Sequence, residues 1–391
     1  SSSFVKKTIA QSLLFSPKKG VAGGATVQTL TQTKTSWFYN WGYVPGYKTT
    51  SGFDNWDPLI WQKFIPLFSG KNYTSVDSQM EEICAKTNYC HKGNYYLIGN
   101  EPDIAVEDMV AGSINSALDA AFFQGEVIKR IKIKDPSAKF IILGLSSKKE
   151  DFIRNYIIEW KNRWMETAIA DLSAVATGWH FHTYSNYREC PANDALPRDF
   201  LRIVDDQMQK TFGKIIPNQE LWITEMGSLD NIPPPYPSSA ERDAFKNRMR
   251  CLTKVYENSP VVTRYAWFYF GCNSSVHTYE KCNEKTFSPY NLYFPPNDEY
   301  CRDPFCITDL GQVYSTLPTA ISPTSTPPLS KATLVFTIKF PQITGNNTPP
   351  KTATVTLKQG GLVISNFDNV AISNLNDSTG RYQGTISNIP P

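Results

Sequence analysis

The sequence predicts an α/β fold, a (β/α)8 TIM barrel followed by a small all-β, sandwich-like module. Three observations predict it. Between residues 19 and 317, eight short runs of β-branched and aromatic residues alternate with longer segments of helical periodicity, which is the pattern of a parallel barrel. After a Pro-, Ser- and Thr-rich stretch, the remainder alternates apolar and polar residues with a period of two. The chain has 391 residues, more than the roughly 250 that a barrel needs, so a second domain fits.

Taken in chain order, the first predicted element is an amphipathic helix over residues 4–14, expected to cap the bottom of the barrel. The candidate strands follow at 19–22, 37–41, 64–68, 95–99, 139–143, 178–182, 221–224 and 264–268. Apolar residues at helical spacing lie between strands, as at 80–84, 114–122 and 200–212, and a last helix is expected to begin near Asp309. Two connections that follow strands, 185–198 and 271–308, are too long for simple turns and are expected on the face that carries barrel active sites.

The composition change near residue 317 predicts the domain boundaries. The barrel domain is expected at residues 1–316 and a semi-rigid linker at 317–330. A small β accessory module is expected at 331–391, with its last strand cut short, and we expect it to serve as a spacer or an immunoglobulin-like domain.

Charge and hydropathy exclude several classes of function. The formal net charge is only +3 and neither sign collects in a long run, which argues against a nucleic-acid partner. No apolar stretch reaches the roughly 18 residues of a membrane span. Aromatic residues make up 13% of the chain, which supplies stacking surface for a weakly charged ligand such as a sugar, although an ordinary core explains them equally well.

Eight cysteines form an even set without a CxxC pair: Cys84, Cys90, Cys190, Cys251, Cys272, Cys282, Cys301 and Cys306. Short separations such as 84 to 90 favour local disulfides, and therefore a secreted or cell-surface protein. A zinc site is the weaker interpretation, because it requires more closely spaced ligands and more histidines than the four in this sequence. The complete pairing stays open.

Two glutamates carry the functional hypothesis. Glu101 follows the fourth candidate strand and Glu225 follows the seventh, and the ends of barrel strands converge on one pocket. Two carboxylates facing one glycosidic bond suffice to hydrolyse it, one as proton donor and the other as nucleophile or base. We expect burial and mutual repulsion to raise the pKa of Glu101, and hydrogen bonds to keep Glu225 charged. Taken singly, Glu101 before Pro102 is also typical of a helix N-terminus, and Glu225 of a structural ion pair.

His180, His182 and Tyr184 fall on one face of the sixth strand, because side chains repeat every two residues. An HxH pair in a barrel also suggests a metal-dependent amidohydrolase, but that site needs further ligands that the remaining histidines do not supply at strand ends. We therefore expect no metal and no cofactor. His182 and Tyr184 are expected to hydrogen-bond sugar hydroxyls, and His180 to pack inside the barrel.

Aromatic and amide residues on two strands are candidates for sugar contacts, since the apolar faces of sugars stack on flat rings. They are Trp37, Tyr39, Asn40 and Trp41 on the second strand and Trp267 and Tyr269 on the eighth. Barrel core is the alternative, above all for Trp37. Trp267 is expected to be the better platform, because its strand neighbours that of Glu225.

With these residues assembled, the chain resembles a clan A glycoside hydrolase, most closely the Asl1-like glycoside hydrolase family 128. The matching segments occur in the family's order: Trp37 to Trp41, Phe64 to Phe68, Leu97 to Asp103, His182 to Tyr184, Trp222 to Glu225 and Arg264 to Phe268. The resemblance implies a barrel in which Glu101 is the acid/base and Glu225 the nucleophile. It also implies a β-1,3-glucan substrate that is cut internally, with Asn100 binding the sugar at the cleavage site.

We therefore expect a retaining endo-β-1,3-glucanase that acts as a monomer on a polysaccharide. A clan A hydrolase for mannan, xylan or mixed-linkage glucan stays open, because subsite shape sets linkage preference. A non-catalytic polysaccharide-binding surface protein is the alternative from another class, although a pure binder gains little from two buried like charges.

Overall fold

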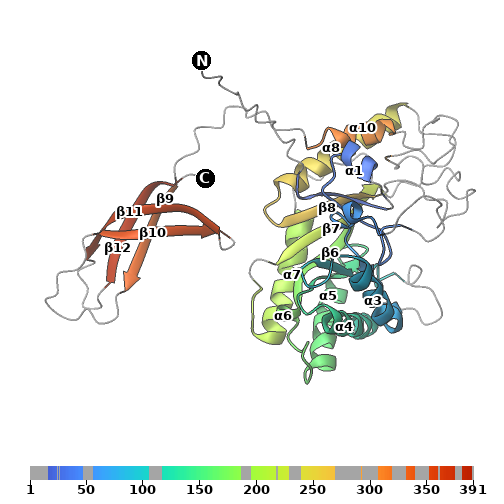
Figure 1. Cartoon of the computed structure of the whole chain (residues 1–391), viewed down its shortest axis with the longest axis horizontal. Coiled ribbons are helices and arrows are strands. Elements are labelled where there is room, and N and C mark those ends of the chain that lie inside the picture. The colour runs from blue at the N-terminus through green and yellow to red at the C-terminus, as the bar shows by residue number, and fades with distance from the viewer. Residues whose placement is uncertain are drawn as a thin grey trace, which may run out of the picture. The chain divides into compact units, whose positions relative to one another are not determined.

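The computed structural model describes residues 16–23, 25, 27–46, 56–104, 117–185, 195–216, 219–228, 239–268, 292, 307–318, 332–339, 352–359, 362–374 and 381–389. The chain divides into two compact units, residues 1–320 and 321–391. The first contains a parallel sheet surrounded by helices, and the second an antiparallel sheet (Figure 1).

Eight parallel strands of the first unit form a nearly closed barrel. They are β1 (Lys19–Ala22), β2 (Trp37–Tyr39), β3 (Leu67–Phe68), β4 (Tyr95–Ile98), β5 (Lys139–Leu145), β6 (Ala176–Ser185), β7 (Glu220–Ser228) and β8 (Val262–Phe268). The sheet order runs β2-β1-β8-β7-β6-β5-β4-β3. A parallel bridge between Phe38 and Phe64 brings the two edges together, supported by a 2.9 Å hydrogen bond from the Ile65 N–H to the Phe38 carbonyl. The predicted eight-stranded barrel is thus confirmed.

Helices cover the outside of this sheet (Figure 1). They are α1 (Val27–Gln32), α2 (Pro58–Trp61), the 3-10 helix η1 (Gly70–Ser75), α3 (Val76–Lys86), α4 (Ala117–Lys134), α5 (Glu150–Trp164), α6 (Leu172–Val175), α7 (Ala195–Phe212), α8 (Ser239–Asn258) and α10 (Asp309–Ser315). The last begins at Asp309, as predicted. The connection predicted at 185–198 ends earlier than expected, because α7 already begins at Ala195. The predicted helix at 4–14 and most of the connection 271–308 lie outside the described residues.

The apolar side chains form two layers, because successive residues of a strand face opposite sides of the sheet. The larger cluster packs the outer face of the barrel against the helices. The smaller one fills the barrel interior and comprises Ala22, Trp37, Tyr39, Ile65, Leu67, Leu97, Ile141, Trp222 and Ala266. The barrel is therefore packed like a core, and ligands are confined to its ends.

One predicted local disulfide is confirmed. Cys84 in α3 is bonded to Cys90, with 5.4 Å between their Cα atoms, so the bridge staples the end of the helix to the connection before β4. Cys251 in α8 is also disulfide-bonded. The other five cysteines lie outside the described residues. Within the described part of the chain, no helix is long and apolar enough to cross a membrane.

The described strands of the second unit form one antiparallel sheet in the order β10-β11-β12-β9. Their bounds are β9 (Ala332–Lys339), β10 (Thr352–Gln359), β11 (Leu362–Asn374) and β12 (Arg381–Ile389). The period-two alternation of the sequence predicted this antiparallel module. A sandwich of two facing sheets stays a prediction.

Candidate active site

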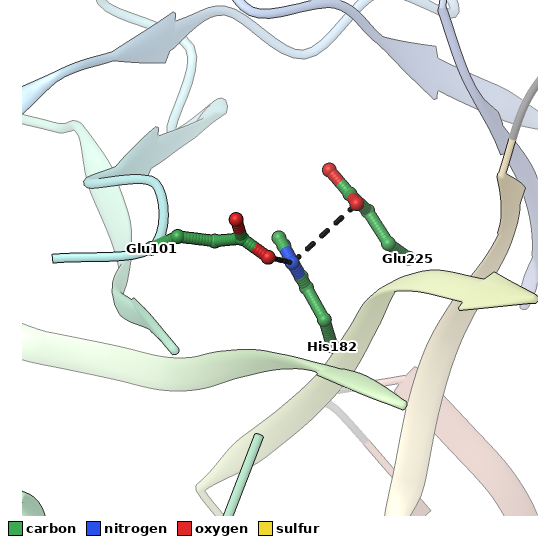
Figure 2. A group of neighbouring side chains, drawn as sticks. All are labelled: Glu101, His182 and Glu225. Carbon is green, nitrogen blue, oxygen red and sulfur yellow. Dashed lines mark hydrogen bonds and ion pairs between the residues drawn. The ribbon is translucent and has the colours of Figure 1, made fainter. Parts of the chain in front are cut away.

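Three titratable side chains meet at the C-terminal end of the barrel. Glu101 follows β4, while His182 and Glu225 are paired neighbours on β6 and β7. Figure 2 shows the imidazole of His182 between the two carboxylates. Its Nδ1 lies 2.7 Å from Glu101 Oε1 and 3.4 Å from Glu225 Oε2. One carboxylate oxygen of Glu101 lies within 4.8 Å of one of Glu225, so the two glutamates predicted from strand ends do share one site.

A β-bulge turns Glu225 toward this site. Phe181 pairs with Ile223, but the next residue, His182, pairs with Glu225, so Thr224 is an extra residue in β7. Strict alternation would send Thr224 inward and Glu225 outward. The bulge instead lets Thr224 hydrogen-bond the interior His180 at 3.0 Å while Glu225 also faces inward. Glu225 therefore lies within β7, whereas the sequence placed it directly after the strand.

The position of Glu101 is fixed by a turn that is tied to β5. Residues 101–104 form the turn, Glu101 has a left-handed φ of 46°, and its N–H donates to the Gly144 carbonyl at 2.6 Å. The buried carboxylate of Asp103 accepts hydrogen bonds from the Ser146 N–H and hydroxyl at 2.9 and 2.7 Å and pairs with Lys149 at 2.8 Å. The alternative that Glu101 begins a helix is thus wrong.

Two glycines allow β4 and β5 to approach at this end. Gly99 and Gly144 have φ of 90° and 69°. A Cβ at Gly144 would come within 2.6 Å of the Gly99 carbonyl oxygen and 2.8 Å of the His180 ring. Only glycine fits such left-handed, crowded positions without strain.

The buried His182 lies between the two acids, which favour its charged form. Burial by itself lowers the pKa of His182, but the charge of Glu225 and the hydrogen bond to Glu101 outweigh burial, so the pKa is raised. The side chains of His182, Glu101 and Glu225 are 0%, 12% and 5% exposed. When His182 is protonated, its charge offsets the mutual repulsion of the two carboxylates.

Three further donors hold Glu225 in one orientation. The Tyr39 hydroxyl and the Trp41 indole N–H donate to Oε1 at 3.0 and 3.1 Å, and the Tyr184 hydroxyl donates to Oε2. Burial and the nearby charge of Glu225 raise the pKa of both tyrosines well above the usual value, so their hydroxyls keep their protons. Glu225 is therefore fixed from both sides, as an attacking carboxylate must be.

Three of the residues predicted to contact sugar, Trp41, Tyr184 and Asn100, lie at or beside the candidate site. Trp41 and Tyr184 lie at the site through Glu225. Asn100 is partly buried, and its Oδ1 has no hydrogen-bond partner among the described residues, which leaves it available to a ligand. Their contacts with sugar stay predictions. Tyr269 lies outside the described residues.

Asn40 has structural contacts instead. Its amide donates to the carbonyls of Val44 and Pro45, both at 2.8 Å, and its Oδ1 accepts from the Gly42 N–H at 3.0 Å. The side chain is 1% exposed. These bonds use its two donor hydrogens and hold the connection after β2, so they favour positioning of Trp41 over sugar binding.

Trp267 does not face the site. It is buried in the outer cluster with its ring centroid 6.4 Å from that of Tyr314 in α10. The next residue of β8, Phe268, faces inward and contacts the rings of Trp41 and Tyr184, at centroid distances of 5.9 and 5.6 Å. The prediction of a Trp267 platform was wrong by one residue. The alternation along β8 could have identified Phe268, because residues two apart, such as Ala266 and Phe268, face the same side of the sheet.

Glu101, His182 and Glu225 are also residue types that can bind a metal ion. In the described part of the chain they form a group close enough together to do so. His180, the first histidine of the HxH pair, does not join them. His180 is fully buried, as predicted, with its ring nitrogens 3.0 Å from Thr224 Oγ1 and 3.4 Å from the Ile98 carbonyl. An amidohydrolase site would need both histidines, so this arrangement disfavours it.

A barrel that brings two carboxylates to opposite sides of one small space is equipped as a glycoside hydrolase. The chain belongs to the glycosyl hydrolase catalytic core family, whose model matches residues 19–294.

Solved structures resemble the barrel. An endo-β-1,3-glucanase of family GH128, subgroup II, from Pseudomonas viridiflava is 18% identical, with a TM-score of 0.50, and the match covers 78% of this chain and 98% of that one. A related enzyme from Sorangium cellulosum is 18% identical over 77% and 98%, with a TM-score of 0.48. At this identity the first likeness supports the fold alone. A search of curated proteins gives no significant match.

Proposed function

We propose that this glycoside hydrolase is a retaining endo-β-1,3-glucanase, with Glu101 as acid/base and Glu225 as nucleophile. The observation that carries the proposal is the meeting of the two carboxylates around His182, with one oxygen of Glu101 within 4.8 Å of one oxygen of Glu225. Retaining enzymes keep them about 5 to 5.5 Å apart, whereas inverting enzymes leave about 6.5 to 9.5 Å for a water molecule.

In the proposed reaction, Glu225 attacks the anomeric carbon while Glu101 protonates the glycosidic oxygen. The bond to the leaving sugar breaks and a glycosyl ester forms on Glu225. Glu101, now a carboxylate, then takes a proton from water as that water displaces Glu225 from the anomeric carbon, which returns both groups to their starting states. His182, whose Nδ1 lies 2.7 Å from Glu101 Oε1, holds the acid/base in position for both steps.

The β-1,3 linkage rests on less local evidence. The ordered segments shared with family 128, and the fold shared with a family GH128 endo-β-1,3-glucanase, support it. The aromatic wall of Trp41, Tyr184 and Phe268 beside Glu225 suits the apolar face of a glucose unit. Mannan, xylan and mixed-linkage glucan are the alternatives.

The test measures reducing sugar released from laminarin and from a panel of these other polysaccharides. Glu225→Gln and Glu101→Gln are each expected to lower kcat by at least about a thousandfold. Glu81→Gln, the same change on the exposed face of α3, is the control and should retain full activity. Equal activity of the wild type and Glu225→Gln would refute the assignment. The anomeric form of the first product, read by proton NMR, decides between retention and inversion.

We also propose that the protein works outside reducing compartments. The Cys84–Cys90 bridge supports this, because such bonds persist mainly in oxidising surroundings.

A further inference from the structure

A second cavity lies at the opposite end of the barrel from Glu101 and Glu225. It has a volume of about 780 Å³, within the range of ligand sites. Its walls include the first residues of β2 and β4, Trp37 and Tyr95, together with Arg264 near the start of β8 and residues 85–89 and 92–94 before β4. Glu220 and Glu225 pair with Gly178 and His182, which are four residues apart on β6, so the two glutamates lie about 13 Å apart at ~3.3 Å per residue. Tyr95 of the cavity wall donates to Glu220, and the inner core fills the space between the two ends.

Arg264 has an unusual environment in this cavity. Its guanidinium lies 4.4 Å from the ring centroid of Trp222, 5.0 Å from that of Tyr95 and 5.7 Å from that of Trp37. The nearby Glu220 accepts from the Tyr95 hydroxyl at 2.5 Å and the Trp222 N–H at 2.8 Å, and its charge acts on Arg264 without a hydrogen bond between them. Among the described residues, no acceptor receives a hydrogen bond from the Arg264 side chain. A guanidinium has five N–H donors in a fork that matches a carboxylate.

The rest of the described lining points to the same ligand class. It contains four cations, Lys63, Lys86, Lys92 and Arg264, and no acidic residue. Lys86 is paired with Glu82 and Lys63 donates to the Thr35 carbonyl, but within the described part of the chain Lys92 has no ion pair. Aromatic rings and the exposed amides of Gln62 and Asn88 complete the wall. Rings and amides suit a sugar, and the cations add a preference for a negative charge.

We propose that this cavity is a second ligand site, which binds an acidic sugar through a carboxylate held by Arg264 and Lys92. The volume favours an oligosaccharide over an inorganic anion, which would leave most of the space unfilled. The ligand class is thus a short oligomer of uronic acid units, different from the neutral glucan proposed for the catalytic end.

The test is calorimetric titration of the full chain carrying Glu225→Gln, with tri-galacturonate as probe and with laminaritriose and inorganic phosphate as comparisons. Because no turnover is needed, the result is independent of the proposed hydrolysis. Tri-galacturonate is expected to bind without being displaced by laminaritriose. Adding Arg264→Gln should weaken binding about tenfold or more, since a hydrogen bond to a charged group contributes about 1.5–3 kcal/mol. Adding Lys92→Gln should weaken it about two- to fivefold.

Lys254→Gln removes one exposed charge from α8, outside the described lining, and should leave the affinity unchanged. If Arg264→Gln does not fold, as judged by thermal unfolding, Lys92→Gln decides, because its exposed side chain has no described contact. Absence of tri-galacturonate binding overturns the proposal. Equal affinity for phosphate, displacement by laminaritriose, or full affinity in both cavity variants overturns it as well.

Discussion

Two histidines of one strand show how strongly the surroundings of a residue decide its chemistry. His180 and His182 face the same side of β6 and both are fully buried. Two carboxylates raise the pKa of His182 against the effect of burial, whereas burial, with the charge of His182, lowers the pKa of His180 to about 3. The same residue type therefore has a raised pKa beside the two acids and a lowered pKa inside the barrel.

The low pKa of His180 predicts an acid-dependent loss of stability. The unfolded chain protonates this residue below about pH 6.5, but the folded state does not until about pH 3. Stability is therefore lost as the pH falls from 6.5 to 3, by about 4 kcal/mol for this group alone. We expect the free energy of unfolding of His180→Gln to fall less steeply over that range. His91→Asn, at an exposed histidine, is the control, and parallel curves for wild type and His180→Gln would contradict the prediction.

At the scale of elements, strand β8 separates two functions by side-chain parity. Trp267 packs outward against α10 and Phe268 inward beside Trp41 and Tyr184. The outward residue joins the barrel to its helices, and the inward one lines the candidate site. Likewise, the bulge at Thr224 reverses the parity of Glu225 on β7.

This division predicts that a substitution at Trp267 affects stability, whereas a substitution at Phe268 affects activity. Trp267→Phe should lower the free energy of unfolding by about 1 to 3 kcal/mol and leave the kcat/KM for laminarin of the folded protein near the wild-type value. Phe268→Ala should lower kcat/KM by about tenfold, because it removes an aromatic contact of the site. Denaturant unfolding and steady-state kinetics measure the two effects. The reverse pattern would show that Trp267 is the sugar platform.

At the scale of the whole molecule, the candidate site and both of its core layers belong to residues 1–320. The sheet of residues 321–391 is a separate compact unit. Neither Glu101 nor Glu225 depends on it for a described contact.

We therefore expect a chain ending at residue 320 to hydrolyse soluble laminarin as fast as the full chain. Loss of activity in a truncated protein with unchanged thermal unfolding would show that the second unit contributes to the site. Comparing the two proteins on insoluble glucan tests whether that unit binds polysaccharide, because deletion would then weaken retention on the solid.

The barrel, the positions of its strands and the two glutamates at one end could all be predicted from the sequence. Hydrophobic periodicity is a local signal that predicts the strands. Once a barrel is inferred, its geometry brings the ends of those strands together. The close spacing of Cys84 and Cys90 likewise predicted their bond.

The neighbours of each side chain could not be predicted and became known from the folded structure. Three features depend on contacts between distant residues. They are the bulge that turns Glu225 inward, the hydrogen bonds of Asn40 to the connection after β2, and the position of His182 between two acids. The outward direction of Trp267 was overlooked for a related reason, since parity must be counted from a known inward residue. Periodicity reports on one strand at a time, whereas register, bulges and hydrogen bonds between distant residues are properties of the assembled sheet.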